Sequence, residues 1–182
     1  MNGLHVPRLL PPGKSVDVID GIDCTLVDNG MPCVIMRATD LGVTGYESRE
    51  QLHADEPLKA RLETIRLQTG PMMALGDVKD KTVPKMPLVS KAQNGGAIGT
   101  RSFIPHRCHA TIGVFAAISV ASGCLIYGSP AQELAVIPKD GLICIEHPTG
   151  AAEMLIKQDN QGGITVAVTS RTTRKLLDGK VY

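Results

Sequence analysis

The side chains best suited to chemistry lie in one segment, "TRSFIPHRCHATIGVF", which covers residues 100–115. Cys108 stands between His106 and His109 in this segment. A thiolate can act as a nucleophile or a base, and histidine exchanges protons near neutral pH. Arg101 could bind a carboxylate through its planar guanidinium group. We therefore predict a proton-transfer site with Cys108, His106 and His109 as catalytic residues and Arg101 as a substrate-binding residue.

The sequence around this cluster predicts a buried helix that runs from about Pro105 to Ser122. Proline suits the first turn of a helix, and Gly123 suits the residue that ends one. The helix would place Cys108 beside unpaired backbone N–H groups, which favour a thiolate. The body "ATIGVFAAISVAS" has no polar face, so protein should surround it. The alternative is that the cysteine and histidines are packed and hydrogen-bonded side chains without a chemical role.

A second candidate is the turn in "DNGMPCV", residues 28–34. Asn29 and Gly30 tolerate positive φ angles, so the turn could present backbone N–H groups to a ligand. We include Asn29, Gly30 and Met31 as substrate-binding candidates, although an ordinary turn explains the same residues. Lys85 could add positive charge to a pocket, whereas most surface lysines are only solvated.

The remaining pattern predicts an α+β fold in which strands outnumber helices. Alternating or apolar runs predict strands at residues 15–20, 22–28, 33–38, 85–90, 97–104, 142–147, 152–157 and 164–170. Ser48 and Asp55 can each cap a helix, and apolar spacing from Glu56 predicts an amphipathic helix that ends near Gly70. We expect a curved, mostly antiparallel sheet wrapped around a central apolar helix, with the amphipathic helix outside.

Composition excludes several classes of protein. The 182 residues carry a formal net charge of +1, which gives no strong field to attract nucleic acid. The longest apolar stretch, residues 110–127, is broken by Thr, Ser and Gly, so no membrane span is expected. The N-terminus lacks a secretory signal, and we expect a cytoplasmic protein. Five cysteines form no CxxC pair, so neither a disulfide framework nor a metal site is indicated.

Several ordered motifs resemble the C-terminal half of the PrpF family. They are "DNGMPCVIMRATDLGVTGYE", "LGDVKDKTVPKM", "TRSFIPHRCHATIGVFAAISVA", "IEHPTG" and "RTTRKLLDGKVY". The resemblance implies a diaminopimelate epimerase-like fold with two similar lobes, each a curved sheet around a central helix, and a substrate cleft between them. It also implies an isomerase or tautomerase that shifts a proton on an unsaturated or keto di- or tricarboxylate such as 4-oxalomesaconate, with no metal and no organic cofactor.

The sequence departs from this family in one respect. The Gly-Gly-Thr-Ser-Lys-like and Asn-Cys-Gly-Asn-like motifs of the family's N-terminal lobe are missing. We therefore expect residues 1–13 to be a linker or the remnant of a missing N-terminal lobe, and residues 14–182 to form the C-terminal lobe. Such a chain would supply one wall of the site and be inactive alone, completed by a second copy or a separate N-terminal lobe. The alternative is a non-catalytic carboxylate-binding or interaction module.

Overall fold

The structure is a computed structural model that describes residues 9–158 and 164–170. Within these residues eight strands form one sheet, and their order in the sheet is their order in the chain. The strands are β1 (Asp17–Ile19), β2 (Ile22–Asp28), β3 (Pro32–Arg37), β4 (Met86–Ser90), β5 (Ile98–Phe103), β6 (Leu142–His147), β7 (Gly150–Gln158) and β8 (Ile164–Ser170). The predicted α+β class is therefore confirmed.

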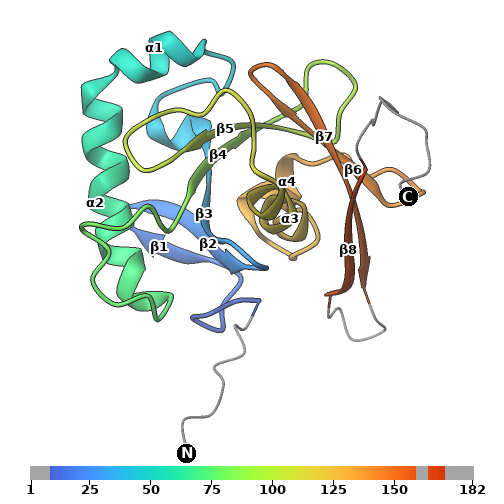
Figure 1. Cartoon of the computed structure of the whole chain (residues 1–182), viewed down its shortest axis with the longest axis horizontal. Helices are drawn as coiled ribbons and strands as arrows, with labels where there is room; N and C mark the ends of the chain where they lie inside the picture. Colours follow the sequence, from blue (N-terminus) through green and yellow to red (C-terminus); the bar gives the residue numbers. More distant parts are fainter. Residues whose placement is uncertain (1–8, 159–163, 171–182) are drawn as a thin grey trace, which may run out of the picture.

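The sheet is mostly antiparallel, as expected. Among the described strands only β3 with β4 and β5 with β6 pair in parallel. A parallel pair needs a crossover connection, and each crossover here contains the helices. The first carries the 3₁₀ helix η1 (Ala38–Leu41), α1 (Arg49–Ala54) and α2 (Glu56–Met72), and the second carries α3 (Val114–Gly123) and α4 (Pro130–Leu134). Figure 1 shows α2 along the outside and α3 end-on at the centre, with the sheet curving around it.

The two crossovers create two hydrophobic cores, one on each face of the sheet. Alternate residues of β3 belong to the two cores: Val34 and Met36 pack towards α2, whereas Cys33 and Ile35 pack towards α3. This alternation follows from the two-residue period of a strand. The central strands are consequently buried on both faces.

The outer helices follow their local sequence signals. Ser48 caps α1 in a reciprocal capping box with Gln51, and the Asp55 carboxylate accepts the Leu58 N–H at the start of α2. The buried side of α2 includes Leu62, so the predicted apolar stripe faces the sheet. The helix continues to Met72, about half a turn beyond the predicted end.

The predicted helix at residues 105–122 is wrong at its start, because α3 begins only at Val114. The chain beyond β5 first folds back as a tight hairpin instead: the Ile104 N–H donates to the Arg107 carbonyl over 3.0 Å. Phe103 and Cys108 then form an antiparallel bridge. These backbone bonds satisfy the polar groups that a helical turn would have used. The segment around Pro105 therefore folds as a hairpin and does not begin a helix.

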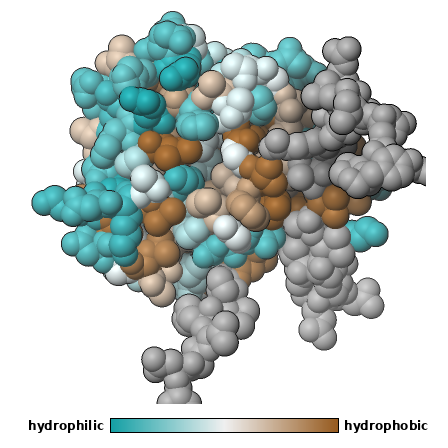
Figure 2. Space-filling view, viewed as in Figure 1, coloured by the Kyte–Doolittle hydropathy of each residue, from teal (hydrophilic) through white to brown (hydrophobic). Residues whose placement is uncertain are grey.

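The central helix is also less enclosed than its sequence suggests. It packs against β2, β3, β6, β7, β8 and α4, yet Phe115 in its first turn is 58% exposed. In the same view, Figure 2 shows hydrophobic residues reaching the surface near the middle of this face. The described helices include none that is long and apolar enough to cross a bilayer.

Part of the predicted N-terminal linker is attached to this lobe. The Asp28 N–H donates to the Leu9 carbonyl over 2.9 Å, and Leu9 and Leu10 pack against the core on the α3 side. Residues 1–8 of that linker, and residues 159–163 and 171–182 of the predicted lobe, lie outside the described part of the chain.

Candidate functional site

Several chemistry-bearing segments meet at one edge of the sheet. The turn at residues 29–31 joins the end of β2 to the start of β3, and Cys33 bridges Lys85 just before β4. Met86 in turn pairs with Phe103, the last residue of β5. This register brings the 29–31 turn, Lys85 and the hairpin after β5 together, although they lie far apart in the sequence.

The 29–31 turn is bound to the central helix. The Ser119 hydroxyl accepts the Asn29 N–H over 3.2 Å and donates to the Met31 carbonyl over 2.7 Å. The Asn29 side chain donates to the Ser122 hydroxyl over 3.0 Å. Gly30 has φ +89°, and a Cβ there would lie 3.2 Å from the Phe115 ring. The turn therefore lies along one side of α3, from Phe115 in its first turn to Ser122 in its last.

These contacts bear on the predicted substrate-binding role of Asn29, Gly30 and Met31. The backbone N–H of Asn29 and its side-chain amide are used inside the lobe, and the Gly30 N–H binds the Asp28 carboxylate. Burial raises the pKa of Asp28, and this N–H bond offsets part of the rise. The turn thus docks α3 through the groups that were expected to contact a ligand.

Cys108 occupies a different position from the predicted one. Its bridge to Phe103 directs the fully buried thiol into the core on the α2 side of the sheet, five residues before the N-cap of α3. Burial raises the pKa of Cys108 to about 11, although Arg101 and Arg49 act in the opposite direction. The expectation of a thiolate stabilised by the first helical turn is wrong, because Cys108 is a protonated thiol at neutral pH and is not part of that turn.

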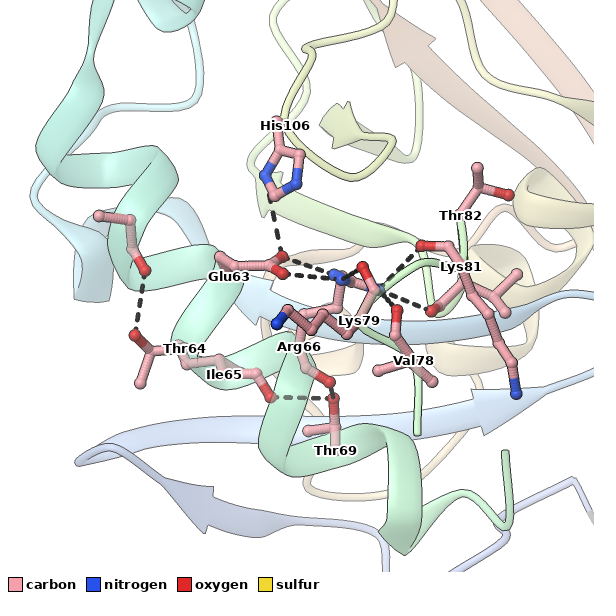
Figure 3. A network of polar contacts seen from close by, with 12 residues as sticks. Glu63, Thr64, Ile65, Arg66, Thr69, Val78, Lys79, Lys81, Thr82 and His106 are labelled. Atoms are coloured by element: carbon pink, nitrogen blue, oxygen red, sulfur yellow. Dashed lines mark hydrogen bonds and ion pairs between the residues drawn. The ribbon is translucent and has the colours of Figure 1, made fainter. Parts of the chain in front are cut away.

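The two flanking histidines point to separate surroundings. The His106 Nδ1 atom lies 3.8 Å from the Glu63 carboxylate on α2. Figure 3 marks this contact between the two side chains. His109 is exposed, and its backbone N–H donates to the Ser102 carbonyl over 2.8 Å. The three residues predicted to be catalytic are therefore close in sequence but do not form one group in space.

Arg101, the remaining predicted substrate-binding residue, is used to hold a loop. Its Nε atom donates to the Glu47 carbonyl over 3.0 Å, and Nη1 donates to the Thr100 carbonyl over 3.1 Å. The Glu47 carboxylate itself accepts the Thr44 and Gly45 N–H groups. Arg101 is half-buried, so it fixes the loop before α1 to the centre of β5.

The segment that leads into α3 is fixed by the turn after β6. The Thr149 hydroxyl donates to the Ala110 carbonyl over 3.0 Å. The His147 ring also hydrogen bonds to Ala110, and burial, with a smaller effect of Arg101, keeps the His147 pKa below its ordinary value despite that bond. These contacts give His147 a structural, hydrogen-bonded role. They position His109 and the N-cap Gly113 at the sheet edge.

Arg66, which sequence inspection missed, organises the loop that precedes Lys85. It is fully buried, and its guanidinium group donates to both Glu63 carboxylate oxygens over 2.6 and 2.7 Å. The group also donates to four backbone carbonyls of the loop (Figure 3), those of Val78, Lys79, Lys81 and Val83. One signal could have revealed it: Arg66 lies four residues after Leu62, on the apolar stripe of its helix.

Metal binding has no support among residues 9–158 and 164–170. No group of three or more His, Cys, Asp or Glu side chains there is placed to hold an ion.

The mixed sheet wrapped around one central helix matches half of a larger fold. The crystal structure of a methylitaconate-delta-isomerase superposes on 94% of this chain with a TM-score of 0.85 at 22% identity, and the match covers 50% of that structure. The fold is therefore that of one half of this isomerase.

The family follows from the sequence comparison. The model of the PrpF protein family matches residues 3–182, and the chain belongs to this family, as its motifs predicted. A "(4E)-oxalomesaconate Delta-isomerase" of Novosphingobium sp. is 54% identical over 99% of the chain and 51% of its own length. A "4-oxalomesaconate tautomerase" of Pseudomonas putida is 54% identical over 98% of the chain and 50% of its own length. The chain spans about half the length of the curated relatives that it matches.

Proposed function

We propose that this chain forms one wall of the active site of an isomerase that shifts a proton on an unsaturated or keto di- or tricarboxylate. 4-Oxalomesaconate is the leading candidate substrate. The observation that carries the proposal is the 54% identity, sustained through nearly the whole chain, with two proteins named for reactions of this compound. A cytoplasmic location is part of the same proposal.

The proposed proton shift requires hydrogen-bond donors at the sheet edge, where the substrate would bind. Removing a proton next to a carbonyl or carboxylate places negative charge on oxygen, which backbone N–H groups stabilise. The first turn of α3 offers such groups, because its N-cap is Gly113, which has no side chain to occupy them. The positive end of the helix dipole adds to the attraction for an anion.

Among the predicted catalytic residues, we propose His109 as the proton-exchanging group of this wall. It is exposed and four residues before the N-cap of α3. Cys108 packs in the core, and His106 attaches the hairpin to α2 through Glu63. Arg101 holds the loop before α1, and the 29–31 turn is bound to α3; both would shape the site without contacting the substrate.

We further propose that the second wall comes from a segment equivalent to the other half of the relatives, or from a second copy of this chain. A monomer of the pure chain should then bind a tricarboxylate without isomerising it. A calorimetric titration with 4-oxalomesaconate, run beside an ultraviolet turnover assay and with the mass of the species measured by light scattering, tests both parts. Isomerisation by the monomer would refute the need for a second wall, and the lack of any carboxylate binding would refute the site.

Adding the separately produced N-terminal half of the Pseudomonas putida relative should restore turnover. In that mixture His109→Ala should reduce turnover at least tenfold. General acid–base catalysis contributes ~10²–10⁴-fold, and this lower bound allows for partial replacement of the ring by water. The matched control is Cys108→Ala, which should change the rate little after correction for the folded fraction. The opposite ranking would return the catalytic role to Cys108.

The second candidate function is a non-catalytic carboxylate-binding module. The dispersal of His106, Cys108 and His109 to three surroundings favours it, because none of these three side chains is paired with another of them as acid and base. Carboxylate binding that stays without turnover in the presence of the second half would support the module over the isomerase.

A further inference from the structure

Lys85 is a buried cation without an anionic partner in the described part of the chain. Only 9% of the residue is exposed, and its Nζ atom donates to the Thr82 carbonyl over 2.7 Å. No carboxylate of residues 9–158 or 164–170 forms an ion pair with it. An ammonium group has three N–H donors, so this carbonyl leaves donor capacity unused.

The backbone places the Lys85 side chain on the α3 side of the sheet. The Lys85 N–H donates to the Pro32 carbonyl over 2.8 Å, and the Val34 N–H donates to the Lys85 carbonyl over 2.9 Å. Lys85 and Cys33 are parallel bridge partners, and paired residues of neighbouring strands project to the same face. Cys33 belongs to the core under α3, and its thiol is hydrogen bonded to Ser119.

Cys33, the titratable group that acts on the pKa of Lys85, does not neutralise this cation. Burial raises the pKa of Cys33 to about 12, so the thiol stays protonated at neutral pH. Burial also lowers the pKa of Lys85, with Cys33 acting weakly against the shift. A buried charge without a counter-charge is unfavourable, and an anion beside it would remove that cost.

The loop before β4 holds the ammonium group in place. Arg66 binds the carbonyls of Lys81 and Val83, which flank Thr82. The Thr82 carbonyl that orients Nζ is therefore fixed from both sides by a buried guanidinium group. Such preorganisation reduces the entropy lost when a ligand binds.

We propose that Lys85 binds a carboxylate group of the ligand at the sheet edge, beside the 29–31 turn and α3. Ser119 connects the two, because it contacts Cys33 and both ends of that turn. The assignment of that carboxylate to a di- or tricarboxylate substrate rests on the proposed function. Lys85 would supply the substrate carboxylate with the positive charge that the sequence predicts to come from the residues around Cys108.

The test is a nuclear magnetic resonance titration of the intact chain with labelled lysine side chains, using citrate as a tricarboxylate probe and acetate as a simple carboxylate. The Lys85 side-chain signals should shift on addition of citrate, and the Lys85 pKa should rise in the complex. Lys85→Met should weaken citrate binding at least tenfold. Lys91→Met, at an exposed lysine after β4, is the matched control and should change binding less than twofold.

The outcomes separate this inference from the proposed function. Citrate binding that leaves the Lys85 signals unmoved would overturn the role of Lys85 and leave the proposed function standing. An acetate-dependent shift of Lys85, without any citrate binding, would support the anion site and count against the proposed substrate class. No response of Lys85 to either anion would overturn the inference outright. The measurement on the unsubstituted chain decides the matter even if Lys85→Met does not fold.

Discussion

Replacing Arg66 with methionine tests whether its buried network holds the lobe together. The substitution keeps a long flexible side chain but removes the guanidinium group. It leaves the Glu63 carboxylate without its bidentate partner and four loop carbonyls without a donor. Water cannot replace these bonds freely, because Arg66 is fully buried. The variant should therefore be much less stable and should release the loop that orients Lys85.

The expected magnitude follows from the complete burial of Arg66, whose partner Glu63 has a side chain that is 23% exposed. Removing one partner of a buried ion pair costs about 3–5 kcal/mol. A change of 1 kcal/mol shifts the melting temperature of a chain of this size by roughly 2–4 °C, so Arg66→Met should lower it by roughly 6–20 °C. Arg66→Lys keeps the charge but not the planar guanidinium group. Its melting temperature should therefore lie between those of the native chain and Arg66→Met.

Urea titration followed by circular dichroism gives the free energy of unfolding for each variant. The matched control is Arg61→Met on the same helix. Arg61 pairs with Asp20 over 3.3 Å, and both side chains are about 40% exposed. An exposed pair of this kind contributes roughly 0–1 kcal/mol. Equal destabilisation by Arg66→Met and Arg61→Met would refute the argument that burial gives the Arg66 network its importance.

Three further predictions concern other parts of the lobe. Burial alone would raise the pKa of Glu146, but N–H bonds from residues 93–96 outweigh it and hold the pKa below 4.5. Glu146→Gln should therefore cost about 1.5–3 kcal/mol at pH 7. The difference should shrink as pH falls below the ordinary pKa of a glutamate and the native carboxylate gains its proton. A pH-independent difference in urea midpoints would contradict this. Four buried thiols have raised pKa values, about 12 for Cys24, Cys33 and Cys124 and about 11 for Cys108. The unfolded chain loses these protons first, so the free energy of unfolding should fall as pH rises above 9, and constant stability between pH 8 and 10.5 would show that burial does not shift the thiols. Asn29→Ala and Ser122→Ala should each cost about 1 kcal/mol, and their combination should cost less than the sum in a double-mutant cycle, whereas full additivity would mean that the 3.0 Å bond contributes nothing.

Local sequence signals determined most of the elements. The strands lie at or within a few residues of the predicted ranges, because alternation and flanking turn residues act within a few positions of each other. Ser48 and Asp55 cap the helices that they were expected to cap, since an N-cap bond spans only three residues. The family could likewise be recognised from ordered motifs alone, and the family model confirms it.

The start of the central helix shows where local signals fail. Pro105 is compatible with a helical first turn, but it is equally compatible with the turn of a hairpin. The choice depended on whether Cys108 could pair with Phe103, which in turn depended on the sheet edge that β4 and β5 form. Such pairing is set by the register of the whole sheet and leaves no signature within the segment.

By itself, the sequence determined the elements, the fold class and the reactive side chains of this protein, because each of these depends on neighbours in the chain. Only the tertiary structure decided what surrounds those side chains. Burial made Cys108 a protonated core thiol. The packing of α2 against the sheet buried Arg66, whose guanidinium group binds the carbonyls of the loop before β4. The parallel register of β3 and β4 left Lys85 as a buried cation beside α3. Charge state depends on solvent exposure and on partners distant in sequence, and both arise only when the sheet closes around its helix.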